Sequence, residues 1–455
     1  MNTEILKQKI NSLRSYPNLD KGSIEILHSS LQKLDDWHLF QINPISFANE
    51  NGLDPNESID LFIHGAKIGL FDFEWNLICP MCGSKVKTHT SIADIEKHKI
   101  HCVICDIDVE TDLSNFIEVS FSINPQLHKI NLDPYASYEN YSRYYFSGNY
   151  HPPQEFLVYF TGRAHKNFVV IEPDTNKKVE FMPTKNMLHR CSSLENNSIL
   201  RIKTTNEERD DPHIIDIDLL LSGFSPHTIE IPTSRVILNL KSYLPDKAAF
   251  ITFEADVTQV QSYMKQTPPY FDDFLTGKML LTRQSFRDLF RIQTLPPNFQ
   301  LKISDVTILF TDLKSSTELY EKTGDMSAYN HVQDHFELLK KSTKKHAGAI
   351  IKTIGDAIMA SFAHPKDGVE AAIEMIGNVQ EMNQQAQVNH DFAIKVGLHS
   401  GTALAVTANN LLDYFGQTVN LAARVQGLAE GSELWMTDVI HQNPEVQKIL
   451  SENGL

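Results

Sequence analysis

The sequence lacks any apolar run that approaches the roughly 18 residues needed to cross a bilayer. Its first residues also lack the apolar stretch of a secretory signal peptide, so we expect a cytoplasmic protein with no membrane partner. Positive charge is not in excess, because 41 basic residues stand against 57 acidic ones and the formal net charge is −16. This balance disfavours unspecific binding to nucleic acids or anionic membranes.

Cysteine is scarce, and its spacing indicates a metal site. Four of the five cysteines form two Cys-x-x-Cys pairs that are nineteen residues apart, namely Cys79, Cys82, Cys102 and Cys105. This pattern predicts a zinc ribbon in which four thiolates hold a structural Zn²⁺ and leave no position for water, with a redox dithiol pair as the alternative. His98 and His101 lie nearby and are expected to face solvent, and Cys191 is expected to be a partly buried thiol.

The first seventy residues show helical patterns separated by stop signals. Gly52 ends one segment, Pro55 stands where a first helical residue is favoured, and Gly69 ends the next segment. Short helices before the extended run LFDFEWNLI are typical of a helix-turn-helix or winged module, which would make DNA a candidate partner. Residues 1–110 contain 10 basic and 16 acidic residues, however, so DNA binding is not favoured.

The middle of the chain is rich in short strand-like runs. They are separated by Pro, Asn, Asp and Gly and predict a β-sandwich or barrel-like module. The runs are Phe116–Ile123, Phe156–Phe160, Phe168–Ile171, Ser198–Ile202, Ile214–Leu221, His227–Ile231 and Phe250–Phe253. Ligand sensing, partner docking and support of a dimer remain open as its role. Tyr270–Phe290 is predicted to be helical, and Leu295-Pro-Pro-Asn marks the boundary that follows.

The last 150 or so residues follow the order βαββαβ, which is typical of a ferredoxin-like domain. The expected strands are Asp305–Thr311, Ala349–Ile354, Ala357–Phe362 and Phe392–Gly397 with an extension through Ala403–Val406. Ser315 or Ser316 is expected to cap the first helix, and Thr418–Leu428 is expected to be helical.

Two carboxylates are expected to meet on this scaffold. Asp312 ends the first strand and Asp356 occupies the turn of the hairpin, so they converge if the strands are neighbours. Such a pair suits two Mg²⁺ ions, which need oxygen ligands and leave room for phosphate oxygens. Asn420 and Arg424 are four residues apart, which places them on one face of a helix.

The blocks FTDLKSST, IKTIGDAIMASF, VGLHSG and DYFGQTVNLAARV resemble the catalytic domain of class III nucleotidyl cyclases, over about residues 304–438. The resemblance implies two Mg²⁺ or Mn²⁺ ions per active site, an asparagine that orients the ribose and an arginine that stabilises the transition state. The positions that match are Asp312, Leu313 and Asp356 for the metals, Asn420 for the ribose and Arg424 for the transition state. His399 is expected to be structural.

The resemblance also places the base-reading positions on Lys352 and Asp413. Adenine offers an acceptor at N1 and a donor at N6, so a lysine donor with an aspartate acceptor favours ATP over GTP. In the family each site forms between two catalytic domains, and this chain carries both sets of residues. A two-fold symmetric homodimer is therefore implied.

We thus expect a multi-domain α+β protein that acts as an adenylate cyclase. The expected regions are a helical, winged-helix-like module (1–70), a zinc ribbon (71–115), a β-rich sensor or regulatory domain (116–268), a helical linker (269–303) and the cyclase domain (304–455). The alternatives are a guanylate cyclase, a catalytically weak nucleotide-binding regulator and a zinc-containing transcription regulator. The family's domain usually continues through further strands with a basic residue for the triphosphate, so lower activity or a weaker dimer is expected. A regulatory ligand or protein is expected to act on residues 1–300.

Overall fold

The computed structural model describes the chain except residues 206, 208–209, 292, 315–324 and 387–392. Its N-terminal part is helical, with α1 (Thr3–Arg14), α2 (Lys21–Leu31), α3 (Pro44–Asn51) and α4 (Pro55–Lys67). Local chemistry fixes these boundaries, because Asn43 and Asp54 cap helices that begin with proline. Gly52 ends α3 at φ 66°, a left-handed conformation that favours glycine, as the sequence predicted.

A three-stranded sheet follows the helices, and the four cysteines lie in the chain segments that connect its strands. Its order is β2 (Lys85–His89), β1 (Phe71–Ile78) and β5 (Ile117–Ile123). Between β2 and β5 the chain forms the short helix η1 (Ile92–Asp94) and the hairpin of β3 (Lys99–Cys102) and β4 (Ile107–Glu110). The first cysteine pair thus lies between β1 and β2, and the second lies at the β3–β4 hairpin between β2 and β5.

The β-rich region contains two sheets that share one hydrophobic core, in which Leu200, Leu238 and Phe250 are fully buried. The first has the order β13-β10-β9-β15-β7 and the second β12-β11-β14-β8. Their bounds are β7 (His165–Ile171), β8 (Asn176–Phe181), β9 (Leu188–Ser193), β10 (Ser198–Thr204), β11 (His213–Leu220), β12 (Gly223–Ser225), β13 (Thr228–Ile231), β14 (Val236–Ser242) and β15 (Ala248–Ala255).

One predicted strand of this region is wrong. Phe156–Phe160 lies in α6 (Gln154–Tyr159) and the helical turn η2 (Phe160–Ala164). Two aromatic side chains of these helices, on Tyr159 and Phe160, pack in a small cluster with Ala255 of β15. The remaining elements beside the sheets are α5 (Tyr138–Tyr145), β6 (Tyr150–His151), α7 (Val257–Gln266) and β16 (Tyr270–Phe271).

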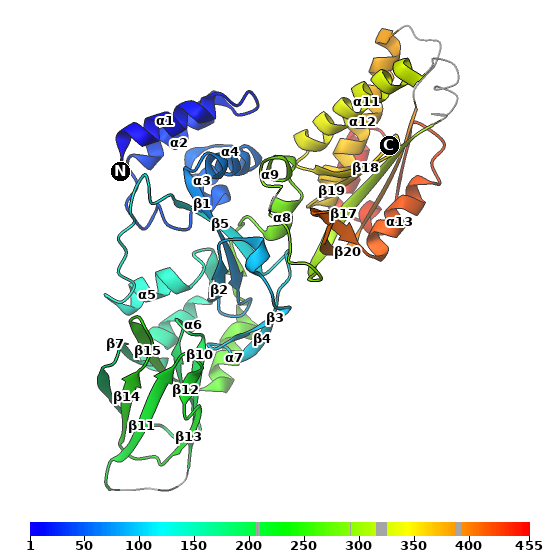
Figure 1. Cartoon of the computed structure of the whole chain (residues 1–455). Coiled ribbons are helices and arrows are strands. Elements are labelled where there is room, and N and C mark those ends of the chain that lie inside the picture. The colour runs from blue at the N-terminus through cyan, green and yellow to red at the C-terminus, as the bar shows by residue number, and fades with distance from the viewer. Residues whose placement is uncertain (206, 208–209, 292, 315–324, 387–392) are drawn as a thin grey trace.

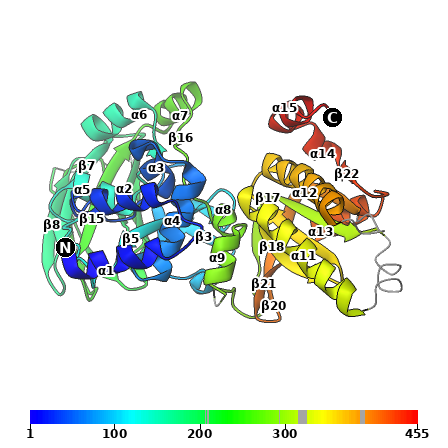
Figure 2. The same ribbon diagram turned by 90° about the horizontal axis from the view of Figure 1, so that it is seen from above.

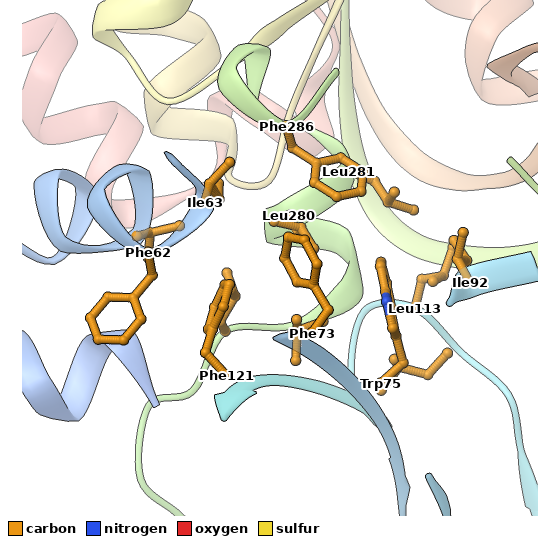
Figure 3. Close-up of a cluster of buried hydrophobic side chains, with 14 of the residues drawn as sticks. Phe62, Ile63, Phe73, Trp75, Ile92, Leu113, Phe121, Leu280, Leu281 and Phe286 are labelled. Atoms are coloured by element: carbon orange, nitrogen blue, oxygen red, sulfur yellow. The ribbon is translucent and has the colours of Figure 1, made fainter. Parts of the chain in front are cut away.

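Two short helices, α8 (Gly277–Leu281) and α9 (Gln284–Leu289), join the N-terminal part to the C-terminal sheet. Figures 1 and 2 show them between the N-terminal helices and the C-terminal strands. The sequence predicts a helix over Tyr270–Phe290, but Tyr270–Phe271 forms the strand β16, and the helical part is divided between α8 and α9. In Figure 3, Phe62 of α4, Phe73 of β1 and Phe286 of α9 belong to one buried cluster, so the hydrophobic core continues across this junction.

The C-terminal sheet has the order β18-β19-β17-β20-β21, and β22 pairs with the first half of β20. Helices α11 and α12 cover one face, and α13 packs on the opposite face. The expected order βαββαβ is present. The bounds are β17 (Leu301–Leu313), α11 (Asp325–Lys345), β18 (Ala349–Ile354), β19 (Ala357–Phe362), α12 (Pro365–Ala386), β20 (Ile394–Ala408), β21 (Leu411–Phe415), α13 (Gln417–Gln426), β22 (Glu433–Met436), α14 (Asp438–His441) and α15 (Pro444–Glu452).

In the described part of the chain, no helix combines the length and the apolar character needed to cross a membrane. The expected helix cap at Ser315 or Ser316 lies outside the described residues.

Candidate active site and cysteine cluster

Asp312 and Asp356 lie at the same end of the C-terminal sheet. β17 pairs with β19 through Phe310 and Met359, and Asp356 occupies the turn between β18 and β19. Gly355 makes this turn possible with φ 65°. Burial raises the pKa of the Asp312 carboxyl group, and the nearby charge of Asp356 raises it further. The predicted neighbourhood of the two strands is confirmed.

The carboxylate pair is suited to a hard cation. Oδ2 of Asp356 is buried and has no hydrogen-bond donor among the described residues. Such an atom carries an uncompensated desolvation cost that a divalent cation would remove, and carboxylate oxygens are ligands that Mg²⁺ prefers. The side chain of Leu313 is 4% exposed and packs in the core, so only its main chain could contribute a metal ligand.

Lys352 and Asp413 form an ion pair within one chain. Nζ of Lys352 donates a hydrogen bond to Oδ2 of Asp413 at 2.7 Å. Their strands, β18 and β21, stand at opposite ends of the sheet order. The two side chains can meet only because the sheet bends, so that the part of β20 that pairs with β21 turns toward β18. A bulge between Ile303 and Val306 marks a bend in the β17–β20 ladder. The lysine side chain is 40% exposed and the aspartate side chain 19%, so the pair remains open to a ligand.

Asn420 and Arg424 lie on α13, and both are exposed. Among the described contacts, neither side chain bonds to Asp312 or Asp356. The helix is held very close to the sheet, because a Cβ atom on Gly397 of β20 would lie 2.1 Å from the backbone nitrogen of Gln426. Glycine at position 397 therefore sets how near α13 approaches the strand.

The four cysteines Cys79, Cys82, Cys102 and Cys105 gather into one cluster, with their sulfur atoms within 4.8 Å of one another. Sγ of Cys79 lies 3.9 Å from Sγ of Cys105, and Sγ of Cys82 lies 3.7 Å from Sγ of Cys102. These distances are too long for disulfides. They are close to the edge of about 3.8 Å expected for four sulfurs around a tetrahedral Zn²⁺ at about 2.3 Å. The cluster therefore fits zinc, which would act as a structural clamp.

The neighbouring histidines stand outside this cluster. The ring of His98 is exposed and stacks on Phe299, and His101 bonds to Asp106 and Asp108 at 3.0 Å.

Cys191 is also separate from the four-cysteine cluster. The sequence predicted a partly buried thiol, but Cys191 is fully buried, and burial raises its pKa to about 12.

Asp106 connects the cysteine segment to the β-rich region. Its backbone nitrogen donates to the carbonyl of Cys102 at 2.8 Å, and its carboxylate forms ion pairs with Arg190 and Arg201 of β9 and β10. The hydrogen bond from Arg201 lowers the pKa of Asp106, so this carboxylate stays charged. Asp106 thus links the loop after Cys102 to two strands of the β-rich region.

Comparison with known proteins identifies the C-terminal region. Residues 300–453 match the family model described as the adenylate and guanylate cyclase catalytic domain. The C-terminal third of the chain is a class III nucleotidyl cyclase catalytic domain. Residues 7–162 match a second family model, whose description is a family of unknown function (DUF5939).

Curated relatives of the cyclase domain include enzymes named for either nucleotide. An adenylate cyclase of Lachancea kluyveri is 25% identical over 182 residues, which are 36% of this chain and 10% of that protein. The receptor-type guanylate cyclase gcy-4 of Caenorhabditis briggsae is 28% identical over 180 residues, 37% of this chain and 16% of that protein. The match therefore spans only a small part of these relatives.

Among solved structures, the adenylyl cyclase CyaB from P. aeruginosa is 21% identical, with a TM-score of 0.31. The match covers 33% of this chain and 84% of that structure.

Two residues beside the carboxylates of the cyclase domain were missed by the sequence reasoning. Lys395 of β20 pairs with Asp312 across the ladder, and its charge partly offsets the rise in the pKa of Asp312. Only the strand register reveals this neighbour. His335 of α11 is fully buried with no partner for either ring nitrogen among the described residues, and its pKa is lowered by burial to about 4. The sequence offered no signal for it, because a lone histidine on a helix is unremarkable.

Proposed function

We propose that this chain is an adenylate cyclase, which converts ATP to 3′,5′-cyclic AMP and pyrophosphate. In this reaction the ribose 3′-hydroxyl oxygen bonds to the α-phosphorus of ATP, the bond from that phosphorus to the pyrophosphate oxygen breaks, and the hydroxyl proton passes to solvent water. The class of chemistry rests on the cyclase domain. The observation that supports ATP in particular is the ion pair of Lys352 and Asp413.

Asp312 and Asp356 would hold two Mg²⁺ or Mn²⁺ ions through their carboxylates, with the main chain of Leu313 nearby. Bound there, these ions would lower the pKa of the attacking hydroxyl and would offset negative charge on the leaving pyrophosphate. Oδ2 of Asp356, which is buried and accepts no hydrogen bond from the described residues, supports this assignment.

The other residues bind and orient the nucleotide. Lys352 can donate to N1 of adenine while Asp413 accepts from N6, and guanine presents the opposite pattern at these positions. On α13, Asn420 would orient the ribose and Arg424 would offset negative charge on the phosphates in the transition state. Both side chains are exposed, as a substrate contact at an interface requires.

A homodimer would combine these two groups of residues. In the proposed assembly the carboxylates of one chain face the base-reading pair, the asparagine and the arginine of the other, and two equivalent sites result.

Residues 1–300 would regulate the domain, with Zn²⁺ held by the four cysteines as a structural element. The boundaries proposed from the sequence, at residues 70, 115, 268 and 303, remain part of this proposal. The signal that reaches this region would be a ligand or a protein of unassigned chemistry.

The test is a cyclase assay on the full chain at measured oligomeric state, with Mg²⁺ or Mn²⁺ and either ATP or GTP. Cyclic AMP formed in preference to cyclic GMP is the expected result. Preferential cyclic GMP would instead establish a guanylate cyclase, and ATP binding by a dimer without product would establish a regulatory cyclase-like protein.

A further inference from the structure

Helix α9 is bonded to the outer edge of the C-terminal sheet. The backbone nitrogen of Gln284 donates to the carbonyl of Gly348 at 3.1 Å, and its side-chain Oε1 accepts from the backbone nitrogen of Ile350 at 2.8 Å. β18 is the last strand on this side, so these backbone groups have no neighbouring strand. Gln284 satisfies them in place of one, which fixes α9 to β18.

The same helix is bonded to the opposite end of the strand order. One of the two terminal guanidinium nitrogens of Arg287, Nη2, donates to the carbonyl of Leu412 in β21. The hydroxyl of Tyr414, also in β21, reaches the carbonyl of Leu281 in α8 at 3.4 Å. Since Gln284 and Arg287 are three residues apart, less than one helical turn of α9 connects β18 to β21.

These contacts flank the base-reading pair. Ile350 precedes Lys352 by two residues, and Leu412 is the immediate neighbour of Asp413. Three strands separate β18 from β21 in the sheet order, so no ladder hydrogen bond sets the distance between them. Apart from the ion pair itself, α9 is the element among the described residues whose polar contacts reach both β18 and β21, and α8 adds a contact to β21.

α9 is also anchored on its other side, so it does not simply follow the strands. Ser285 donates to Oδ1 of Asp60 at 2.5 Å, and Arg283 donates to the carbonyl of Asn56 at 3.3 Å, both in α4. Leu289, at the end of α9, accepts from Nζ of Lys67 at 2.8 Å. The N-terminal helices therefore fix the helix that holds the two strands, and Figure 3 shows the apolar side of the same junction.

We infer that Gln284 and Arg287 are positioning residues that set the spacing of Lys352 and Asp413 and thereby the preference for one purine base. This inference rests on the proposed function. Neither residue needs to touch the nucleotide. A donor and an acceptor recognise a base only when both are held at the right separation, and small displacements cost large factors in rate.

The test compares Arg287→Met and Gln284→Ala with the full wild-type chain. The first readout is kcat and KM for ATP and for GTP. The second is equilibrium binding of 3′-deoxy-ATP and 3′-deoxy-GTP, which lack the attacking hydroxyl and cannot be cyclised. We expect the ratio of ATP to GTP affinity to change by roughly 10-fold in both variants, mainly through KM. Arg291→Gln is the matched control, because Arg291 is exposed, lies just beyond α9 and makes no polar contact with the described residues of the sheet.

A double substitution separates positioning from general destabilisation. In an Asp413→Ala background the acceptor is already lost, so Arg287→Met should change the base ratio no further. An unchanged ratio in both single variants, with only the melting temperature lowered, would overturn the inference and leave the proposed function intact. If the wild type binds but does not cyclise either nucleotide, the proposed function fails while the binding ratios still decide the inference. If Arg287→Met does not fold, Gln284→Ala decides it.

Discussion

Asp312 and Asp356 carry like charges at one end of the sheet, and burial together with the charge of Asp356 raises the pKa of Asp312. Without a cation, this arrangement stores unfavourable electrostatic energy in the folded state. A site that destabilises the empty protein and is stabilised by its ligand is typical of binding and catalytic centres. The repulsion between Asp312 and Asp356 predicts how substitution of Asp312, a change of pH and added metal should each change the stability of the protein.

Asp312→Asn should abolish cyclisation and also stabilise the metal-free protein. The amide removes the repulsion with Asp356, so the unfolding free energy should rise by on the order of 1 kcal/mol or less. Thermal unfolding in the presence of a chelator measures this, and added Mn²⁺ should raise the melting temperature of the wild type much more than that of the variant. Equal shifts with Mn²⁺ in both proteins would contradict the metal assignment.

The stability of the metal-free protein should depend on pH in a defined direction. A carboxyl group whose pKa is higher in the folded state than in the unfolded state binds its proton more tightly when folded. The metal-free wild type should therefore gain stability from this group as the pH falls through the folded pKa of Asp312, until the unfolded value near 3.8 is reached. Asp312→Asn should lack this gain. Chemical denaturation at several pH values, with a chelator present, measures the difference between the two proteins.

Much of the site could be predicted because its signals are local. Asp312 follows a strand with alternating apolar residues, and Gly355-Asp356 is a turn signal between two strands. The position of Lys352 against Asp413 could not be predicted from local patterns. It depends on the bend of the β17–β20 ladder, where Asp305 takes φ 51°, and on α9, which crosses the junction.

The difference between local signals and long-range packing also explains which parts of the fold could be predicted from the sequence. Helix ends at Asn43, Gly52 and Asp54 are decided by capping within a few residues, so the sequence predicts them. Phe156–Phe160 was assigned to a strand because aromatic and branched residues favour β-structure. Tertiary packing against Ala255 instead keeps this segment helical. The continuous core across α8 and α9 is likewise a property of long-range packing.

Lys352→Glu should change the base preference of the domain. The substitution replaces the donor with an acceptor and places a second negative charge beside Asp413, whose partner was 2.7 Å away. We expect kcat/KM for ATP to fall by roughly 100-fold and the ATP to GTP ratio to fall with it. Lys366→Glu is the matched control, because Lys366 forms an ion pair of the same 2.7 Å length at the same 40% exposure with Glu445, away from the site. A similar loss in both variants would show a general charge effect.

Cys82→Ser should remove Zn²⁺ and loosen the docking of the β-rich region. In the proposed site zinc would shape the loop that presents Asp106 to Arg190 and Arg201, so its loss should weaken these ion pairs. Metal analysis should find about one Zn²⁺ per wild-type chain and none in the variant, and limited proteolysis should cut the variant faster between residues 105 and 190. Cys191→Ser should retain zinc, because Cys191 lies outside the cluster. Full zinc content in Cys82→Ser would contradict the four-cysteine site.

Gly397→Ala should lower the catalytic rate by displacing helix α13. The added Cβ would lie 2.1 Å from the backbone nitrogen and 2.3 Å from the Cα of Gln426, and backbone atoms cannot move aside as a flexible side chain can. α13 must then shift away from β20, which displaces Asn420 and Arg424 on the same helix. We expect a loss of about 1–3 kcal/mol in unfolding free energy and a fall in kcat larger than the change in KM. Gly377→Ala in α12 is the control, since no atom lies within 4 Å of its Cβ position, and it should keep wild-type activity. Wild-type kcat in Gly397→Ala would show that the approach of α13 to the sheet does not set the catalytic geometry.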